Sequence, residues 1–359
     1  MKAEIQQEQA EITEIEISVI SVTSCSNSEN KKYKMKTKNK QNLLAAALVG
    51  ALALTAITSL HAEQSGSGHY LPGATASFID ASPGKPGWVA ENIFMNYSDG
   101  TIGGGRELPF GGNIALNVTA NATADIPLVM FSPDYKILGA LPSFAVAVPI
   151  VWMDIKASGT IDSHGLSVSA NREDKASGLG DIELIPLMLG WTKGDFKYGA
   201  VCAVYAPTGE YDKSQLANAG LGYWTFSPEV TFSWLSSKIG TEVSLFTGLD
   251  FNTKNTDADY QSGDLFHVDA TVAQHLPLFG GFAGVGANGF YIKQISGDSG
   301  SGARLGGFEA ETYGVGPVLS YAHKIGKHDL VCEAKWLPQL DSKNTTKGNY
   351  VWVKIALIF

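Results

Sequence analysis

Histidines and a carboxylate on one face of an extended segment are the residues best placed to do chemistry. His267 and Asp269 stand two positions apart, and His275 follows six positions after Asp269, so all three side chains share a face of a strand. Such a patch binds a solute or senses pH, or it is a hydrogen-bonded ladder that braces the sheet. We expect the bracing role.

Motifs for catalysis or metal binding are absent from the sequence. There is no HExxH, GxSxG or CxxC, and Cys25, Cys202 and Cys332 have no histidine at ligand spacing. The glycine run TIGGG at 101–105 opens no helix, so it does not match a phosphate-binding loop. We therefore expect no catalytic residue, no metal site and no cofactor, and we predict that the protein is not an enzyme.

Composition favours β structure and excludes one class of partner. The chain has 44% hydrophobic and 17% charged residues, with 40 glycines, 13 tyrosines and 7 tryptophans. Aromatic side chains suit a pleated surface, and glycine supplies turn conformations. The formal net charge is −9, whereas a nucleic-acid-binding protein needs a basic stripe. We expect no nucleic acid partner.

The amino-terminal region has the features of an export signal. Residues 35–62 carry three lysines, an apolar run from Leu43 to Leu60, and the small residue Ala62, which is the layout of a secretory signal peptide. We expect cleavage after Ala62, and a retained transmembrane anchor is the alternative. Residues 1–34 precede a second start at Met35 and are a doubtful extension. Residues 63–87 form a plug or a periplasmic tail, and we expect the tail.

Period-two alternation beyond this region predicts membrane-spanning strands. In Tyr223–Leu235 the aromatic residues Trp224, Phe226, Phe232 and Trp234 share one face, and serines and threonines occupy the other. Ten residues separate the two tryptophans, about 33 Å along a strand, which a tilt of ~40° projects to about 25 Å. That height matches the two aromatic girdles of an outer-membrane barrel.

Counting such segments predicts an all-β fold, a transmembrane antiparallel up-and-down β-barrel of about 12 strands over residues 88–359, with 14 as the alternative. The expected strands are 88–97, 113–131, 143–155, 180–191, 196–206, 223–236, 241–251, 265–276, 281–293, 308–321, 328–338 and 349–359. Long connections, including 156–179 and 252–264, mostly alternate with short ones, as outer loops alternate with periplasmic turns.

Charged residues within the predicted strands are expected to face the lumen, because a lysine on the lipid face costs about 2–4 kcal/mol at mid-membrane. The lumen-lining candidates for binding are Glu229, Glu242, Asp250, His267, Asp269, His275, Glu333, Lys335 and Lys354. Charge pairs that fix the register are the expected role, and selectivity for a solute is the alternative. Serine, threonine and glycine are expected to line the rest of the lumen.

The chain ends in GNYVWVKIALIF, which alternates up to the terminal Phe359. A last strand that closes on a terminal aromatic residue resembles the signal read by the bacterial barrel assembly machinery. A buried terminal strand of a soluble domain is the alternative.

Several phrases resemble the MetA-pathway of phenol degradation (SphA-like) outer-membrane transporter family. They are GHYLPG (68–73), GLGDIELIPLMLGW (178–191), AVYAPTGEYD (203–212), GYWTFSPEVTF (222–232), LDFNTKNTDADYQSGDLFHVD (249–269) and GPVLSY (316–321). The resemblance implies an exported barrel associated with uptake of hydrophobic or aromatic compounds.

These observations predict a porin-like channel or transporter of the Gram-negative outer membrane for small, hydrophobic or aromatic solutes. Its expected partners are outer-membrane lipid, lipopolysaccharide and the assembly machinery. Two alternatives stay open: a barrel enzyme of the lipid hydrolase type, with a serine beside His267 or His275, and a surface structural or adhesion barrel that binds through 156–179 and 252–264.

Overall fold

The computed structural model describes residues 68–359 except 103–106, 111–112, 164–165, 304–306 and 308. The proposed extension 1–34 and the proposed signal peptide 35–62 lie outside the described residues. Within them, no helix is long and apolar enough to cross a membrane.

Sixteen strands make up the regular structure of the described residues. They are β1 Gly87–Thr101, β2 Glu107–Phe110, β3 Asn113–Leu116, β4 Thr119–Ser132, β5 Leu141–Ala147, β6 Ile150–Ser163, β7 Leu166–Leu179, β8 Ile182–Lys193, β9 Phe196–Ala206, β10 Thr225–Leu235, β11 Thr241–Asn252, β12 Leu265–Leu278, β13 Gly281–Gln294, β14 Glu311–Ile325, β15 His328–Lys343 and β16 Lys347–Ile358.

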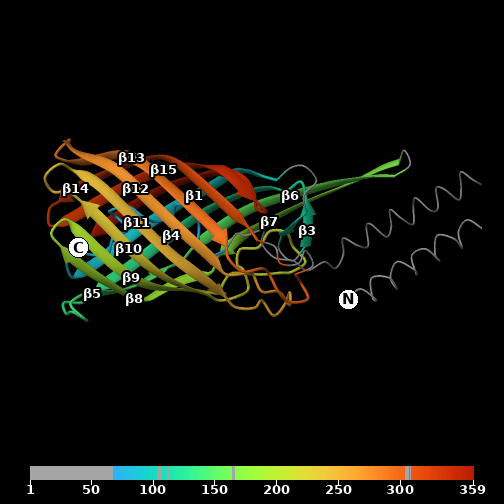
Figure 1. Cartoon of the computed structure of the whole chain (residues 1–359), viewed down its shortest axis with the longest axis horizontal. Helices are drawn as coiled ribbons and strands as arrows, with labels where there is room; N and C mark the ends of the chain where they lie inside the picture. The colour runs from blue at the N-terminus through green and yellow to red at the C-terminus, as the bar shows by residue number, and fades with distance from the viewer. Residues whose placement is uncertain (1–67, 103–106, 111–112, 164–165, 304–306, 308) are drawn as a thin grey trace, which may run out of the picture. The chain divides into compact units, whose positions relative to one another are not determined.

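The main sheet closes on itself. Its order runs β1-β16-β15-β14-β13-β12-β11-β10-β9-β8-β5-β4, and β4 pairs with β1 to complete a ring in which every neighbouring pair is antiparallel (Figure 1). Closure leaves none of these twelve strands with an open edge along the ring. The prediction of a twelve-stranded barrel is confirmed, and β6 and β7 are two extra strands of the same sheet.

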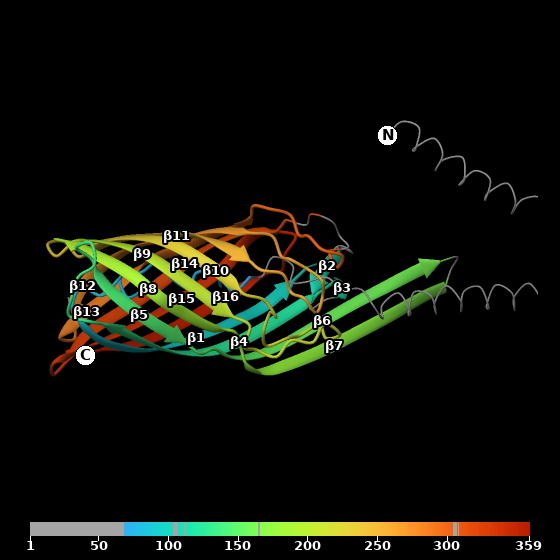
Figure 2. The same cartoon turned by 90° about the horizontal axis from the view of Figure 1, so that it is seen from below.

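The predicted loop at 156–179 is wrong. β6 continues β5 in the same register along β4, because Leu128 pairs with Ala147 and Asp125 pairs with Ile150. β7 returns along the whole of β6, and the two project beyond the other strands as a hairpin (Figure 2). Residues 171–175, NREDK, are polar on both faces, which is why this part of the strand carries no amphipathic alternation.

The predicted strand at 113–131 is shorter in the structure. β4 begins at Thr119, and residues 113–116 instead form β3, which pairs only with β2 in a separate two-stranded sheet. The predicted connection 98–112 therefore contains β2 as well as the end of β1.

Aromatic side chains stand on the outer face near both ends of the barrel strands. Trp224 and Phe226 lie at one end of β10, and both are exposed. Phe232 and Trp234 lie toward the other end, where Phe196 of β9 packs against them with ring centroids 6.2 and 6.3 Å apart. These four residues of the predicted girdle thus point away from the lumen.

The terminal Phe359 joins the end of the barrel seam. Its backbone N–H donates to the carbonyl of Trp88 over 2.9 Å, and its ring packs edge-on against His328 with centroids 5.0 Å apart. The seam pairs β1 with β16 from Val89↔Ile358 upward. The first and last strands of the barrel therefore meet at this residue.

Residues 68–86 form an irregular segment that lies inside the barrel. Tyr70, Ala76 and Ser77 are buried, and the segment bonds to strands β10, β11, β12, β15 and β16 from within. Of the two placements considered for residues 63–87, the described residues occupy the plug position; the expected periplasmic tail does not fit them. We call residues 68–86 the plug segment.

Candidate functional site

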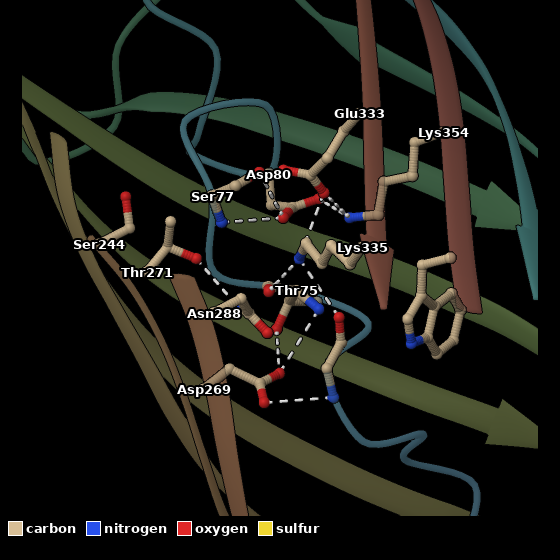
Figure 3. Close-up of polar contacts among 12 residues, drawn as sticks. Thr75, Ser77, Asp80, Ser244, Asp269, Thr271, Asn288, Glu333, Lys335 and Lys354 are labelled. Atoms are coloured by element: carbon tan, nitrogen blue, oxygen red, sulfur yellow. Dashed lines mark hydrogen bonds and ion pairs between the residues drawn. The ribbon is translucent and has the colours of Figure 1, made fainter. Parts of the chain in front are cut away.

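Asp269 of β12 is the central anchor of the plug segment. Its carboxylate accepts hydrogen bonds from the Gly73 N–H over 3.3 Å and from the Thr75 hydroxyl over 3.1 Å (Figure 3). It also accepts one from the Tyr70 hydroxyl. Asp269 is 0% exposed. A buried carboxylate needs such donors, because its transfer from water is otherwise very costly.

Lysines on β15 and β16 hold the plug segment from the other side. Lys335 Nζ donates to the carbonyls of Gly73 and Thr75 over 3.2 and 2.8 Å and lies 3.2 Å from Glu333 Oε1. Lys354 forms an ion pair with Asp80 and lies 3.7 Å from the same Glu333 oxygen (Figure 3). The two lysines are fully buried, so each depends on these partners.

Glu242 of β11 fixes the carboxyl-terminal part of the segment. It accepts hydrogen bonds from the Phe78 N–H and the Ser244 hydroxyl over 2.7 and 2.8 Å. His275 Nε2 lies 2.7 Å from the second carboxylate oxygen, and the Phe78 ring packs edge-on against the imidazole. Glu242 and His275, predicted to line the lumen, thus form one buried anchor.

Tyr70 packs against His267, another of the predicted lumen-lining residues. Its ring stacks on His267 with centroids 3.6 Å apart, and His267 Nε2 lies 3.5 Å from Asp250 Oδ1. Burial raises the pKa of the Tyr70 hydroxyl well above its usual value, and the adjacent carboxylate of Asp269 raises it further. The hydroxyl therefore stays protonated and acts as a donor to Asp269.

A second anchor lies where the plug segment begins. His69 Nε2 lies 2.9 Å from Asp181 Oδ2 and His69 Nδ1 lies 2.7 Å from the Thr225 hydroxyl. Asp181 also accepts from the N–H groups of Gly209 and Leu221 over 2.9 and 2.6 Å. This aspartate thus ties the plug segment to the connection between β9 and β10.

An open cavity of about 660 Å³ separates the plug segment from the opposite wall of the barrel. That wall is formed by β1, β4, β5, β6, β8 and β9, and its lining side chains are mostly apolar. Representative members are Met95, Ala124, Ile126, Met153, Ile155 and Met188. The expectation of a lumen lined by serine, threonine and glycine is therefore wrong for this half of the barrel.

Carboxylates interrupt the apolar wall at separate places. Glu91 of β1 and Glu183 of β8 line the cavity, as does Glu229 of β10. Tyr205 of β9 lies opposite Glu183 in the strand register and interacts with it through a side-chain hydrogen bond. A solute in the cavity therefore meets an apolar surface with a few polar points, as in most small-molecule sites.

All nine lumen-lining candidates point inward. The plug segment brings eight of them into anchors, with Asp250 reached through His267. Glu229 is the candidate outside these anchors, and it lines the cavity together with Lys354. Sequence reasoning missed the partners on the plug segment, His69, Tyr70, Thr75 and Asp80. The only indication of these residues in the sequence was a cluster of polar side chains in a stretch without period-two alternation. Among the described residues, no group of three or more His, Cys, Asp and Glu side chains is arranged to hold a metal ion.

Comparison with solved structures supports the fold. An outer-membrane channel from Pseudomonas putida F1 superposes with a TM-score of 0.54 at 12% identity, covering 81% of this chain and 100% of that one. The β domain of the Bordetella autotransporter BrkA gives a TM-score of 0.44 at 9% identity, covering 77% and 100%. A Pseudomonas aeruginosa FadL homologue gives 0.39 at 8% identity, covering 84% and 98%.

The first of these structures shares the barrel architecture described above. No curated protein matches the sequence. A family model described as "Putative MetA-pathway of phenol degradation" matches residues 103–355, which include the barrel strands except β1 and the last residues of β16. The resemblance found in the sequence is thereby confirmed, and the chain belongs to this family of outer-membrane β-barrels.

Proposed function

We propose that the protein is a Gram-negative outer-membrane channel that conducts small hydrophobic or aromatic solutes along the apolar wall of its lumen. The observation that carries the proposal is the 660 Å³ cavity, which runs beside a firmly anchored plug segment and is lined on its other side by aliphatic and methionine side chains. It binds solutes without catalysing their conversion.

The chemistry of the wall fits this role. An apolar solute that removes about 100 Å² from water gains roughly 2.5 kcal/mol at ~25 cal/mol per Å². That gain is large enough to draw the solute in and small enough to release it, as conduction requires. Methionines such as Met95, Met153 and Met188 add an adaptable surface for solutes of different shape.

The cellular route is part of the proposal. We propose export through residues 35–62 with cleavage after Ala62, and insertion by the barrel assembly machinery, guided by the strand that ends at Phe359. The outer aromatic residues would then lie at the two interfaces of a membrane that contains lipopolysaccharide. Mass spectrometry of the chain recovered from outer membranes would measure the cleavage site directly.

The test uses the exported full chain in a Gram-negative host that lacks its own general porins. Entry of the apolar fluorescent dye N-phenyl-1-naphthylamine is measured in intact cells, and planar-bilayer conductance is measured on the purified protein. Ala124→Phe places a ring in the cavity, and Ala200→Phe places the same ring on the outer face of β9 as a control.

We expect dye entry with the native chain and Ala200→Phe, and a reduction of about fivefold or more with Ala124→Phe. Equal entry in all three, at equal folded protein by heat-modifiable gel mobility, would overturn the proposal. A barrel enzyme requires a serine beside His267 or His275, whereas the contacts found for these rings are with carboxylates and with aromatic rings of the plug segment.

A further inference from the structure

We propose that the channel selects its solutes by charge: it admits neutral and cationic molecules with an apolar body and rejects carboxylates of the same size. This inference rests on the proposed function and adds to it the class of solute. It starts from the titratable side chains that line the cavity.

Acidic groups outnumber basic groups along the cavity. Six carboxylates line it, from Asp80, Glu91, Asp181, Glu183, Glu229 and Asp329, and three ammonium groups, from Lys85, Lys197 and Lys354. With histidines left out, the lining thus holds three more acidic than basic side chains.

Three of the carboxylates are matched by partners. Asp329 lies 3.2 Å from Lys85, Asp80 forms an ion pair with Lys354, and Asp181 is surrounded by His69 and two backbone N–H groups. Lys354 is moreover shared with Glu333, whose carboxylate is also buried. The paired groups therefore supply no spare positive charge to the cavity.

Glu91, Glu183 and Glu229 are the remaining acids, and none of them has a lysine, arginine or histidine nitrogen within 4.0 Å among the described residues. Glu91 pairs in register with Leu128, Glu183 with Ala147 and Glu229 with Val201, so each has an apolar neighbour on one adjacent strand. The neighbour of Glu183 on the other side is Tyr205. Lys197 is the one lining ammonium group without an ion pair among these residues. The excess charge is therefore negative.

The field of these carboxylates is strong because the wall around them is apolar. Two charges about 6 Å apart at an effective dielectric constant of ~20 interact severalfold more strongly than in water, and acidic rings make pores cation-selective in the same way. The carboxylates of the described residues are not arranged as a metal site. The geometry therefore points to an organic cation such as an ammonium on an apolar body, with Tyr205 as a further contact for the charge.

The test compares benzylammonium and benzoate, which share one aromatic body and differ in charge. Reversal potentials are measured across planar bilayers containing the purified full chain, under gradients of benzylammonium chloride, sodium benzoate and potassium chloride. Variants are Glu183→Gln with Glu229→Gln, and Glu173→Gln, which removes a paired carboxylate on the exposed hairpin as the control.

We expect benzylammonium to be at least about fivefold more permeant than benzoate, with Glu173→Gln unchanged and the double variant near a ratio of one. A ratio near one for the native chain, while the apolar dye still enters cells, would overturn this inference and leave the proposed function intact. Absence of both dye entry and conductance would overturn the two together. If the native channel prefers benzylammonium and the double variant keeps the same permeability ratio, other residues determine the selectivity. That outcome would also contradict the role assigned to Glu183 and Glu229.

Discussion

The lumen of this barrel has two unlike halves. Strands β10–β16 present many buried polar and charged side chains, and three of these, Asp269, Lys335 and Lys354, bind the plug segment. Strands β1, β4–β6, β8 and β9 present aliphatic and methionine side chains to an open cavity. The same alternating strand pattern thus builds an anchoring surface on one side and a passage on the other.

The difference shows how a barrel of this size becomes selective. A twelve-stranded ring is too wide for its own side chains to fill, so the chain fills the polar half with its own amino-terminal segment. Polar side chains are then satisfied by protein and not by solute. What remains for the solute is the apolar half, interrupted by Glu91 and Glu183.

The largest effect is expected from removing a buried cation of the anchoring half. Lys354→Met leaves Asp80 and Glu333 without that partner, and breaking a buried pair typically costs about 3–5 kcal/mol. We expect a lower urea midpoint for heat-modifiable mobility and a larger conductance, as the plug segment loosens. Asp80→Asn in the same chain should restore part of both, since it removes the carboxylate that has lost its lysine, whereas Glu333 keeps Lys335. Native conductance and midpoint in Lys354→Met would contradict the anchoring role.

A smaller effect is expected at the central anchor. Asp269→Ala removes the acceptor of the Tyr70 hydroxyl, the Gly73 N–H and the Thr75 hydroxyl, at about 1–3 kcal/mol for donors left buried and unsatisfied. Cysteines introduced at Ala76 and Phe246, which lie in one buried cluster, would report the position of the plug segment by crosslinking. We expect slower crosslinking in the Asp269→Ala background, and an unchanged rate would show that the remaining anchors suffice.

Substitutions in the half of the lumen that lines the cavity should change the affinity for the solute and leave the stability of the protein unchanged. Met153→Gln keeps the size of the side chain and adds a polar amide to the cavity wall, which should weaken the contact with an apolar solute by about 1 kcal/mol. We expect dye entry to fall by about fivefold at an unchanged urea midpoint. Thr271→Val on the anchoring side is the matched control and should leave entry unaltered.

The smallest effect is expected in a loop that lies outside both halves of the lumen. In the connection between β11 and β12, Lys254 and then Ser301 hold the pKa of the Asp259 carboxyl down at about 2. A lowered pKa favours the ionised folded form, so its contribution is present above the ordinary value near 4 and is lost only as the pH falls through about 2. Protease sensitivity of this loop should be the same at pH 7 and pH 5. A rise at pH 5 would show that another group controls the loop.

Much of the barrel could be predicted because membrane-spanning strands must alternate. The twelve segments were identified from period-two patterns, and the rule that charge avoids the outer face placed residues such as Glu242, Asp269 and Lys354 inside. The hairpin β6–β7 was missed for the converse reason: its residues 171–175 are polar on both faces, so the pattern that reveals a strand is missing.

The plug segment could not be predicted, since its structure depends on distant residues. It has no strand or helix of its own, and Tyr70 meets Asp269 across 199 positions of sequence while Trp352 donates to the Pro72 carbonyl across 280. Local periodicity carries no information about such contacts. For the same reason the difference between the two halves of the lumen could not be predicted. The residues of one strand do not indicate whether a distant segment of the chain will pack over that strand.

The position of the plug segment in the chain also affects the order of steps in folding. It is the first part of the described chain, yet Lys335, Trp352 and Lys354, which hold it, come from the last two strands. During synthesis these partners appear at the end, so the anchoring of the segment begun by Asp269 and Glu242 is incomplete until β15 and β16 arrive. The same strands also close the ring, because β16 pairs with β1 directly after the plug segment. We expect seating and closure to occur as one late step, so that a chain truncated before β15 stays open at both its seam and its bore.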